Sequence, residues 1–377
     1  MPEDEVAIRT TFERLGGEQL NTDLIGRDAK GNFPRDEWLK CASAGVQGLP
    51  IPVEHGGSGA TPSMIATALE ALGYGCRDNG LLFSLNAQMW GCEVPILRFG
   101  TPEQRDRYLP ALCDGSTIGA QAMTEPDTGS DAFALTTTAT SGGAGWIING
   151  TKTFVTNAPV ADVLVVFATT DRERGMAAIT AFLVDASTPG VEVGPPFEKM
   201  GLRTSPIAQV TFDGCEIPAD AMLGKDGGGF SVFNTAMDWE RTFIMSSAVG
   251  TMQRQLEACI AFANERTQFG QPIGKFQAVS HRIVDMKMRL ETCRLLLHDV
   301  ASRKAVDRPS PLDASMVKLH LSESFLQSSL DAVQIHGGGG YTADLEFERD
   351  VRDAMAARLY SGTSEIQREV IARRLGL

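Results

Sequence analysis

The chain is poor in positive charge. It has 34 lysines and arginines against 47 aspartates and glutamates among 377 residues, which gives a formal net charge of −13. Such a balance argues against binding of nucleic acid or of an anionic membrane through the surface as a whole. We therefore expect neither as a partner, and an anionic ligand would need a local basic site.

Paired cysteines and long apolar runs are also missing. The seven cysteines are odd in number and none stands in a Cys-x-x-Cys pair, which favours free thiols in a reducing compartment over a disulfide framework. The acidic start of the chain shows no signal peptide, and no apolar run is long enough to span a membrane. His281, His298 and His320 are interpreted as structural or solvated residues. We expect a cytoplasmic protein without a metal site.

Apolar residues divide the chain into three zones. Residues 1–115 carry apolar side chains at helical spacing, punctuated by glycine, and residues 226–377 carry longer amphipathic stretches with the same period. Residues 116–225 instead alternate β-branched and polar side chains. The sequence therefore predicts an α+β protein with an N-terminal helical domain, a middle antiparallel β-domain and a C-terminal helical bundle.

The middle zone contains specific strand and turn signals. Apolar runs at 163–167 and 179–184 predict strands. Asn149-Gly150 stands between the apolar runs 146–148 and 153–155, and this dipeptide favours a tight hairpin turn. We expect a small antiparallel barrel or sandwich with a hairpin at this point.

Several short segments occur in a fixed order along the whole chain. They are MTEPDTGSD at 123–131, KTFVTN at 152–157, RTQFG at 266–270, QAV at 277–279, QIHGGGGY at 334–341 and LYSGTSEIQR at 359–368. In this order they resemble the signatures of the acyl-CoA dehydrogenases. The resemblance implies the fold of that family, with a C-terminal four-helix bundle, and FAD as the cofactor.

The chemistry of these segments suits a flavin. Thr124 and Ser130 offer hydroxyl and backbone N–H groups to a polar ring edge, and Gly129 allows close backbone approach. Phe154 supplies a flat apolar wall, and Arg266 suits phosphate. Taken alone, Phe154 would be interpreted as a core residue and Arg266 as a solvated surface residue. The resemblance implies cofactor contacts by Met123, Thr124, Gly129, Ser130, Phe154, Thr156, Arg266, Gln268, Phe269, Gln334, Gly337, Gly338, Thr363 and Glu365.

Ser361 stands where most members of this family have a glutamate, their catalytic base. A serine hydroxyl cannot hold a proton taken from carbon at pH 7. One branch of the family carries the base on an earlier helix, immediately before an arginine, and Glu240 precedes Arg241 in what the sequence indicates is the start of such a helix. A carboxylate in a dry pocket has a raised pKa and is a competent base, whereas the alternative is an exposed helix charge. We assign Glu240 as the base and the Ser361 backbone N–H as the donor to the thioester oxygen.

The acyl pocket is expected to be short. Bulky Trp90 and Trp239 would close it, with ordinary core packing as the alternative. Substrate contacts implied by the resemblance are Ser130, Asp238 and Arg241. For Asp238 a charge at a helix start is the alternative.

A glutamate after tryptophan, together with a small residue in the late loop, is shared with the prolyl-carrier-protein dehydrogenases. The chain resembles them also at 77–86, 280–287 and 371–377. This implies FAD-dependent α,β-dehydrogenation of an acyl thioester, short or cyclic, such as prolyl on an acyl- or peptidyl-carrier protein. The alternatives are a short- or branched-chain acyl-CoA dehydrogenase of catabolism, and a flavin- or acyl-binding protein without dehydrogenase activity.

The resemblance also implies partners. An electron-transfer flavoprotein or oxygen would accept the electrons. Residues 266–269 would reach the flavin of a neighbouring subunit, so we expect a homo-oligomer built as a dimer of dimers.

Overall fold

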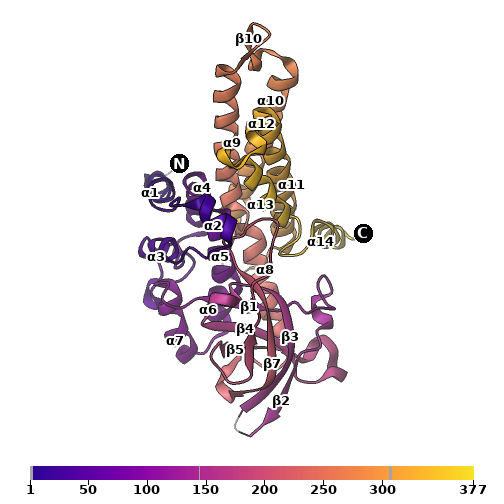
Figure 1. Cartoon of the computed structure of the whole chain (residues 1–377). Coiled ribbons are helices and arrows are strands. Elements are labelled where there is room, and N and C mark those ends of the chain that lie inside the picture. Colours follow the sequence, from indigo (N-terminus) through magenta and orange to yellow (C-terminus); the bar gives the residue numbers. More distant parts are fainter. Residues whose placement is uncertain (1–2, 144, 305–307) are drawn as a thin grey trace.

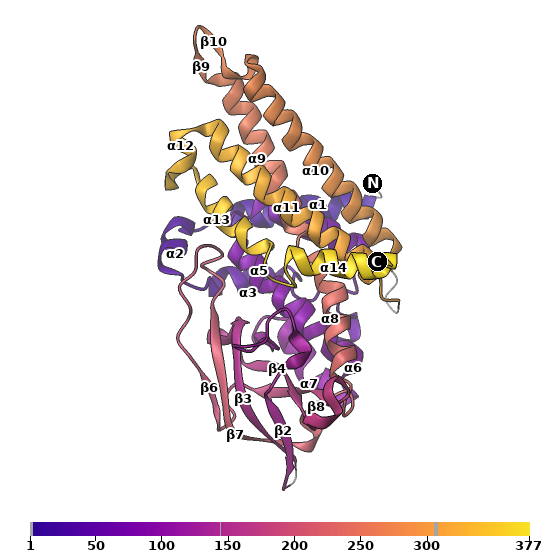
Figure 2. The same ribbon diagram turned by 90° about the vertical axis from the view of Figure 1, so that its right-hand side faces the viewer.

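The chain forms helices at both ends and a β-sheet in its middle. The structure, a computed structural model, describes residues 3–143, 145–304 and 308–377. The N-terminal helices lie beside the C-terminal bundle, and the sheet lies at the lower end of the view in Figure 1, which Figure 2 shows from the side. The order predicted from the sequence, helices then sheet then helices, is confirmed.

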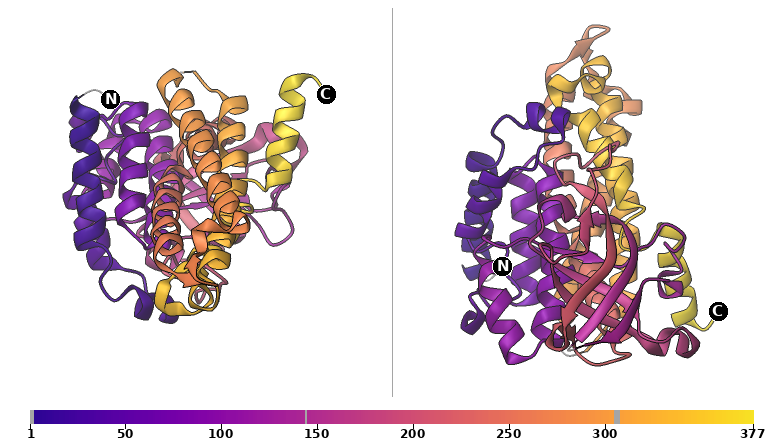
Figure 3. Two further views of the ribbon diagram at one scale, coloured as in Figure 1. Left: turned by 90° about the horizontal axis from the view of Figure 1, so that it is seen from above. Right: turned by 60° about the horizontal axis from the view of Figure 1, so that its bottom comes forward.

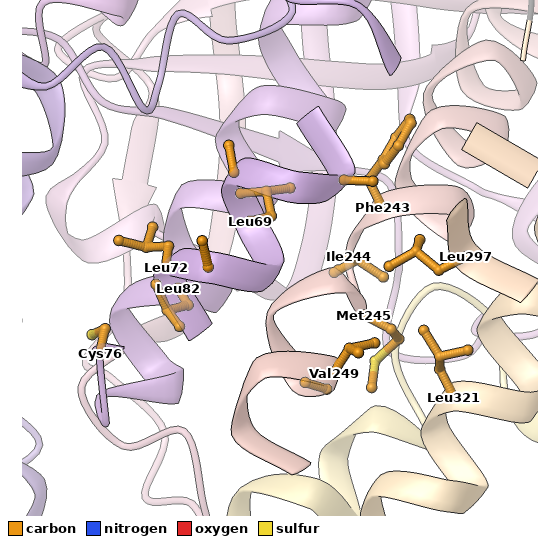
Figure 4. Packing of buried hydrophobic residues seen from close by; sticks show 14 of the residues in the cluster. Leu69, Leu72, Cys76, Leu82, Phe243, Ile244, Met245, Val249, Leu297 and Leu321 are labelled. Carbon is orange, nitrogen blue, oxygen red and sulfur yellow. The ribbon is translucent and has the colours of Figure 1, made fainter. Parts of the chain in front are cut away.

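Three of the N-terminal helices, α4, α5 and α7, begin at a residue whose side chain caps the helix. The Thr61 hydroxyl accepts the Met64 N–H at the start of α4, and Thr101 and Gln104 form a capping box at α7. Buried side chains of α4 and α5 belong to one core with Phe243 and later helices (Figure 4). The helices are α1 (Glu3–Gln19), α2 (Leu24–Lys30), α3 (Arg35–Ser43), α4 (Pro62–Gly75), α5 (Asn79–Gln88), α6 (Val94–Phe99) and α7 (Pro102–Cys113), with a π-helix, η2 (Met89–Glu93), between α5 and α6.

The sheet has eight strands in the order β6-β7-β3-β2-β4-β5-β8, with β1 paired to β4. Neighbours are mostly antiparallel, but β4 runs parallel to both β1 and β2. Every residue of β4 is buried, and alternate side chains enter two different cores, as expected for a strand covered on both faces. The strands are β1 (Gly119–Ala122), β2 (Thr138–Gly142), β3 (Gly145–Thr156), β4 (Val163–Thr169), β5 (Ile179–Asp185), β6 (Val191–Val193), β7 (Ile207–Pro218) and β8 (Met222–Leu223).

The hairpin predicted at Asn149-Gly150 is wrong. Both residues lie inside β3, where the pairing with β7 shifts in register between Ile148 and Gly150. A side chain on Gly150, whose φ is +147°, would come within 2.7 Å of the Thr137 Cα. The glycine is therefore needed at a bulge that bends the strand, and not at a turn.

Long helices form the C-terminal bundle, and α9 and α10 extend beyond it as a pair (Figure 1). Seen from above, the N-terminal helices and α14 lie on opposite sides of the bundle (Figure 3). No helix in the described ranges is long and apolar enough to cross a membrane. The elements are α8 (Gly229–Phe243), α9 (Ser246–Glu265), β9 (Thr267–Gln268), β10 (Gln271–Pro272), α10 (Gln277–Arg303), α11 (Pro311–His336), α12 (Gly338–Tyr341), α13 (Phe347–Ala357) and α14 (Ser364–Leu375).

Candidate active site

Glu240 lies in the last turn of α8, not at its start as the sequence indicated. The helix begins at Gly229, after a glycine-rich turn. Its start therefore lies upstream of residue 236, where apolar side chains continue the helical spacing. A carboxylate near a helix C-terminus is disfavoured by the helix dipole, whereas a cation there is favoured. Helix stability therefore favours the neighbouring Arg241 at this place, but it does not explain the presence of Glu240.

Glu240 and Ser361 meet directly. The Ser361 hydroxyl donates a hydrogen bond to the Glu240 Oε1. Ser361 lies in the loop between α13 and α14 and has a φ of +57°, in the left-handed region that disfavours residues with a side chain. Within the described part of the chain, the Ser361 N–H has no acceptor. The structure thus brings together the two residues that the sequence assigned to catalysis and leaves the backbone donor available.

Three side chains fix the carbonyl groups of this loop. Arg241 Nε donates to the Ser361 carbonyl at 3.0 Å, and Lys318 Nζ donates to the Gly362 carbonyl at 2.7 Å. Gln367 Nε2 donates to both carbonyls, at 3.0 and 2.9 Å. Sequence reasoning missed the roles of both residues, because Lys318 lies in none of the quoted segments and Gln367 lies in the segment 359–368 but was given no role. Only the burial of these two polar side chains could have pointed to them, and burial is seen only in the folded chain.

Burial raises the pKa of the Glu240 carboxyl above its usual value. The hydrogen bond from Ser361 and the positive charges of Arg241 and Lys318 act in the opposite direction and limit the rise. A carboxylate with a raised pKa is a stronger base than one in water. The environment therefore suits proton abstraction.

Trp90, Trp239 and Phe243 form an aromatic cluster between η2 and α8, the helix that carries Glu240. The Trp90 and Trp239 rings are stacked with centroids 6.0 Å apart, and Phe243 lies 5.4 Å from Trp90. Trp90 belongs to the π-helix η2, and such a bulge is frequent at functional sites. The predicted short acyl pocket remains a prediction, because both rings belong to the buried core, as the alternative of ordinary core packing also expects.

Asp238 is 6% exposed, and both of its carboxylate oxygens have partners. Its Oδ2 lies 2.7 Å from Lys304 Nζ, and its Oδ1 accepts the Ser310 N–H at 2.9 Å. These bonds join α8 to the segment between α10 and α11 and favour a structural role over a substrate contact. The alternative reading, a charge at a helix start, is wrong because Asp238 lies near the helix end. Arg241 supports the Ser361 loop, while Ser130 is exposed.

The predicted flavin wall is present in β3. Phe154 is 62% exposed between buried Thr153 and Val155, and its φ is +53°. An aromatic residue that is both exposed and left-handed within a strand is strained, and such strain gathers at functional sites. Its ring lies 5.4 Å from that of Phe197, with the two ring planes tilted by 45°, so the exposed Phe154 ring itself offers the apolar surface. This arrangement fits the stacking surface that a flavin ring requires.

A buried ion pair holds the loop beside this wall. Lys152 Nζ lies 2.9 Å from Glu125 Oε1 and donates to the Met123 carbonyl at 3.0 Å. The Thr124 carbonyl accepts the Thr153 N–H at 2.8 Å. Met123 and Thr124 are thereby fixed against β3, the strand that also carries Phe154 and Thr156. Lys152 and Glu125 are supporting residues that the sequence motifs contained but to which no role was assigned.

The remaining predicted cofactor residues fall into separate groups. Arg266, Gln268 and Phe269 lie at the far tip of the α9–α10 pair, remote from the sheet (Figure 1), and Phe269 is 94% exposed with a φ of +52°. A second group, Gln334, Gly337 and Gly338, lies where α11 ends and α12 begins. Thr363, which caps α14, and Glu365 follow the Ser361 loop directly. Gly129 lies in the loop after β1, where an added Cβ would meet open space. One chain therefore does not gather all of the predicted flavin residues.

No group of three or more His, Cys, Asp or Glu side chains in residues 3–143, 145–304 and 308–377 is placed to hold a metal ion.

Comparison with known families decides the class of protein. The N-terminal, middle and C-terminal domain models of the acyl-CoA dehydrogenases match residues 2–116, 120–215 and 227–376. The chain belongs to the acyl-CoA dehydrogenase family. This membership confirms the predicted fold, the FAD cofactor and the class of oxidoreductase acting on CH–CH bonds.

Similar proteins are known both by sequence and by structure. An L-prolyl-[peptidyl-carrier protein] dehydrogenase of Pseudomonas fluorescens is 42% identical over 93% of this chain and 93% of its own. The crystal structure of the prolyl acyl carrier protein oxidase AnaB superposes with a TM-score of 0.98 and 46% identity over the whole of both chains. A structure of PigA with FAD and proline matches with a TM-score of 0.97 and 38% identity, covering 100% of this chain and 98% of that one.

Proposed function

We propose that this acyl-CoA dehydrogenase homologue catalyses the FAD-dependent α,β-dehydrogenation of a short or cyclic acyl thioester, prolyl in the first place, held on a carrier protein in biosynthesis. The observation that carries the proposal is the contact of Glu240 with Ser361 in the late loop, next to an available backbone N–H. The resemblance to proteins named for prolyl carrier substrates supports the acyl group and its tether.

The residues divide the chemistry between them. Glu240 takes the proton from Cα, so that the Cα–H electron pair forms the new Cα=Cβ bond while hydride leaves Cβ. The Ser361 N–H donates to the thioester oxygen, where negative charge develops. FAD, when bound, supplies the acceptor for the hydride. The hydrogen bond from the Ser361 hydroxyl orients the Glu240 carboxylate before the substrate arrives.

Two copies of the chain are proposed to complete each flavin site. Arg266 and Phe269 stand exposed at a tip far from Phe154 of the same chain (Figure 1), so they would serve a neighbouring subunit. One face of α10 supports such an assembly, because its apolar side chains are more than half exposed at Val284, Met288 and Leu295. We propose a dimer of dimers, in which FAD occupancy and assembly depend on each other.

The acceptor and the compartment belong to the same proposal. The reduced enzyme would pass its electrons to an electron-transfer flavoprotein or directly to oxygen, and admitting air to enzyme reduced under anaerobic conditions separates the two routes. All seven cysteines are buried free thiols, which supports a reducing, cytoplasmic location.

A panel of thioesters tests the proposal. Holoenzyme is mixed anaerobically with prolyl-carrier protein, prolyl-CoA and butyryl-CoA, and the bleaching of flavin absorbance is followed in a single turnover. We expect prolyl-carrier protein to bleach the flavin fastest. Faster bleaching by butyryl-CoA would instead show a catabolic acyl-CoA dehydrogenase, and no bleaching by any thioester would show a binding protein.

A further inference from the structure

Lys318 is a fully buried lysine beside the candidate active site. It lies on α11 with 0% of its surface exposed, and its one hydrogen bond among the described residues goes to the Gly362 carbonyl at 2.7 Å. Its ammonium group also lies 5.8 Å from the centre of the Tyr360 ring. Burying a lysine costs free energy unless its charge is compensated, so this position demands an explanation.

The loop that Lys318 holds is strained. The positive φ of Gly362, +87°, is ordinary for glycine, but that of Ser361, +57°, is disfavoured for a residue with a side chain. Such backbone persists only where the surroundings fix it, and here the fixing groups are Arg241, Gln367 and Lys318. Lys318 donates a hydrogen bond to the carbonyl of Gly362, the residue after Ser361. This bond limits rotation of the backbone that carries the Ser361 N–H.

Charge near Glu240 points to the same residue. Arg241 on α8 lowers the pKa of this carboxyl more strongly, and Lys318 on α11 adds a smaller effect in the same direction. The Cys92 thiol of η2 and the Tyr360 phenol of the loop also face it, and burial raises the pKa of both, so that they stay neutral. Burial lowers the pKa of Lys318 to about 8, so it carries its charge at neutral pH.

We propose that Lys318 is a positioning residue for the reaction, which fixes the Ser361 loop through Gly362 and adds a positive charge that favours the ionised form of the Glu240 carboxyl. This inference rests on the proposed function in taking Glu240 as the base and the Ser361 N–H as the donor to the thioester oxygen. One buried lysine would thus both hold the Ser361 N–H in place for the thioester oxygen and favour the ionised form of Glu240.

Infrared spectroscopy of the holoenzyme tests this directly. The carboxyl stretch of Glu240 is identified by its loss in Glu240→Gln, and its intensity is followed against pH. Removing a nearby opposite charge typically raises a carboxyl pKa by about one unit or more, so we expect Lys318→Met to move the protonation midpoint up by about one pH unit. Lys318→Gln, which loses the charge but keeps a donor, should move it by a similar amount and perturb the fold less.

Lys304→Met is the matched control. The Lys304 side chain is also fully buried and bonded to α8, but through Asp238, so its loss should lower thermal stability without moving the Glu240 midpoint. Folded Lys318→Met and Lys318→Gln proteins with the parental midpoint would overturn the proposal. The outcome is independent of the acyl group, since a failure of the proposed function would appear separately as no bleaching of the parent enzyme by prolyl-carrier protein.

The geometric half of the proposal has its own measurement. Affinity for a non-oxidisable prolyl thioester analogue should fall in Lys318→Met more than in Lys318→Gln, because only the latter can still bond the Gly362 carbonyl. Equal affinities in both variants and the parent would show that Lys318 does not fix the loop.

Discussion

The Ser361 hydroxyl donates a hydrogen bond to the Glu240 carboxylate, although 121 positions separate the two residues. The carboxylate comes from the end of α8, and the small side chain comes from the loop between α13 and α14. A glutamate at position 361 would bring a second carboxylate against the first. A small residue at position 361 therefore leaves room for the carboxylate of Glu240. With Glu240 proposed as the base, no glutamate is needed at position 361.

Changing Ser361 should distinguish the two parts of this residue. Ser361→Ala removes one hydrogen bond to Glu240 but keeps the backbone N–H, so flavin reduction should slow by roughly tenfold or less, the range of a single hydrogen bond. Stopped-flow bleaching by prolyl-carrier protein measures it. A loss as large as that of Glu240→Gln would mean that the hydroxyl itself takes part in the chemistry.

Ser361→Glu in the Glu240→Gln background should recover part of the lost activity. The double variant returns a carboxylate to the loop, and the neutral amide at position 240 removes the like charge that would oppose it. Bleaching faster than in Glu240→Gln alone is the expected result. Ser361→Glu alone is the control, and it should be impaired by two carboxylates that share one site.

Glu240→Gln should raise the thermal stability of the protein at pH 7. The folded-state pKa of Glu240 is raised, so the folded state binds this proton more tightly than the unfolded state does. Stability from this group is therefore present at low pH and lost as pH rises from the unfolded value through the folded one. Melting temperatures should favour Glu240→Gln at pH 7 and converge with the parent near pH 4, and a variant less stable at pH 7 would contradict the direction of the shift.

Lys152→Met should weaken both stability and FAD retention. It leaves Glu125 buried without its cation and frees the Met123 carbonyl, and breaking a buried ion pair in this way costs about 3 kcal/mol or more. Chemical denaturation and the flavin-to-protein absorbance ratio measure the two effects. Lys40→Met, which breaks a pair at a 40% exposed side chain, should cost about 1 kcal/mol or less, and an equal loss in both variants would refute a special role for Lys152.

Acyl groups of about four to six carbons, and prolyl, should react faster than palmitoyl. The stacked rings of Trp90 and Trp239 beside the base leave a short pocket as the expected shape. Bleaching rates with one carrier protein loaded with each acyl group give the comparison. Fastest bleaching by palmitoyl would show that these rings are core and do not bound the pocket.

Sequence alone predicted the base because an absence drew attention to it. The serine at 361 required a carboxylate elsewhere, and Glu240 before Arg241 offered one. The roles of Lys318 and Gln367 were hidden, because their partners are carbonyl groups that only the folded loop presents. The prediction of a turn at Asn149-Gly150 was wrong for a similar reason. The dipeptide suits a turn, but here the glycine is needed at a bulge, because Thr137 packs too close to leave room for a side chain. Local pattern indicated element types and chemical motifs, while tertiary packing decided bulges, helix starts and buried supports.

The most direct test of the account is anaerobic single-turnover bleaching of Glu240→Gln by prolyl-carrier protein. The variant keeps the side-chain volume and the bond to Ser361 within reach, but it cannot accept the Cα proton. General-base catalysis is typically worth about two to four orders of magnitude, so flavin reduction should fall by at least about 100-fold while FAD content stays at the parental level. Bleaching at the parental rate would contradict the assignment of Glu240 as the base.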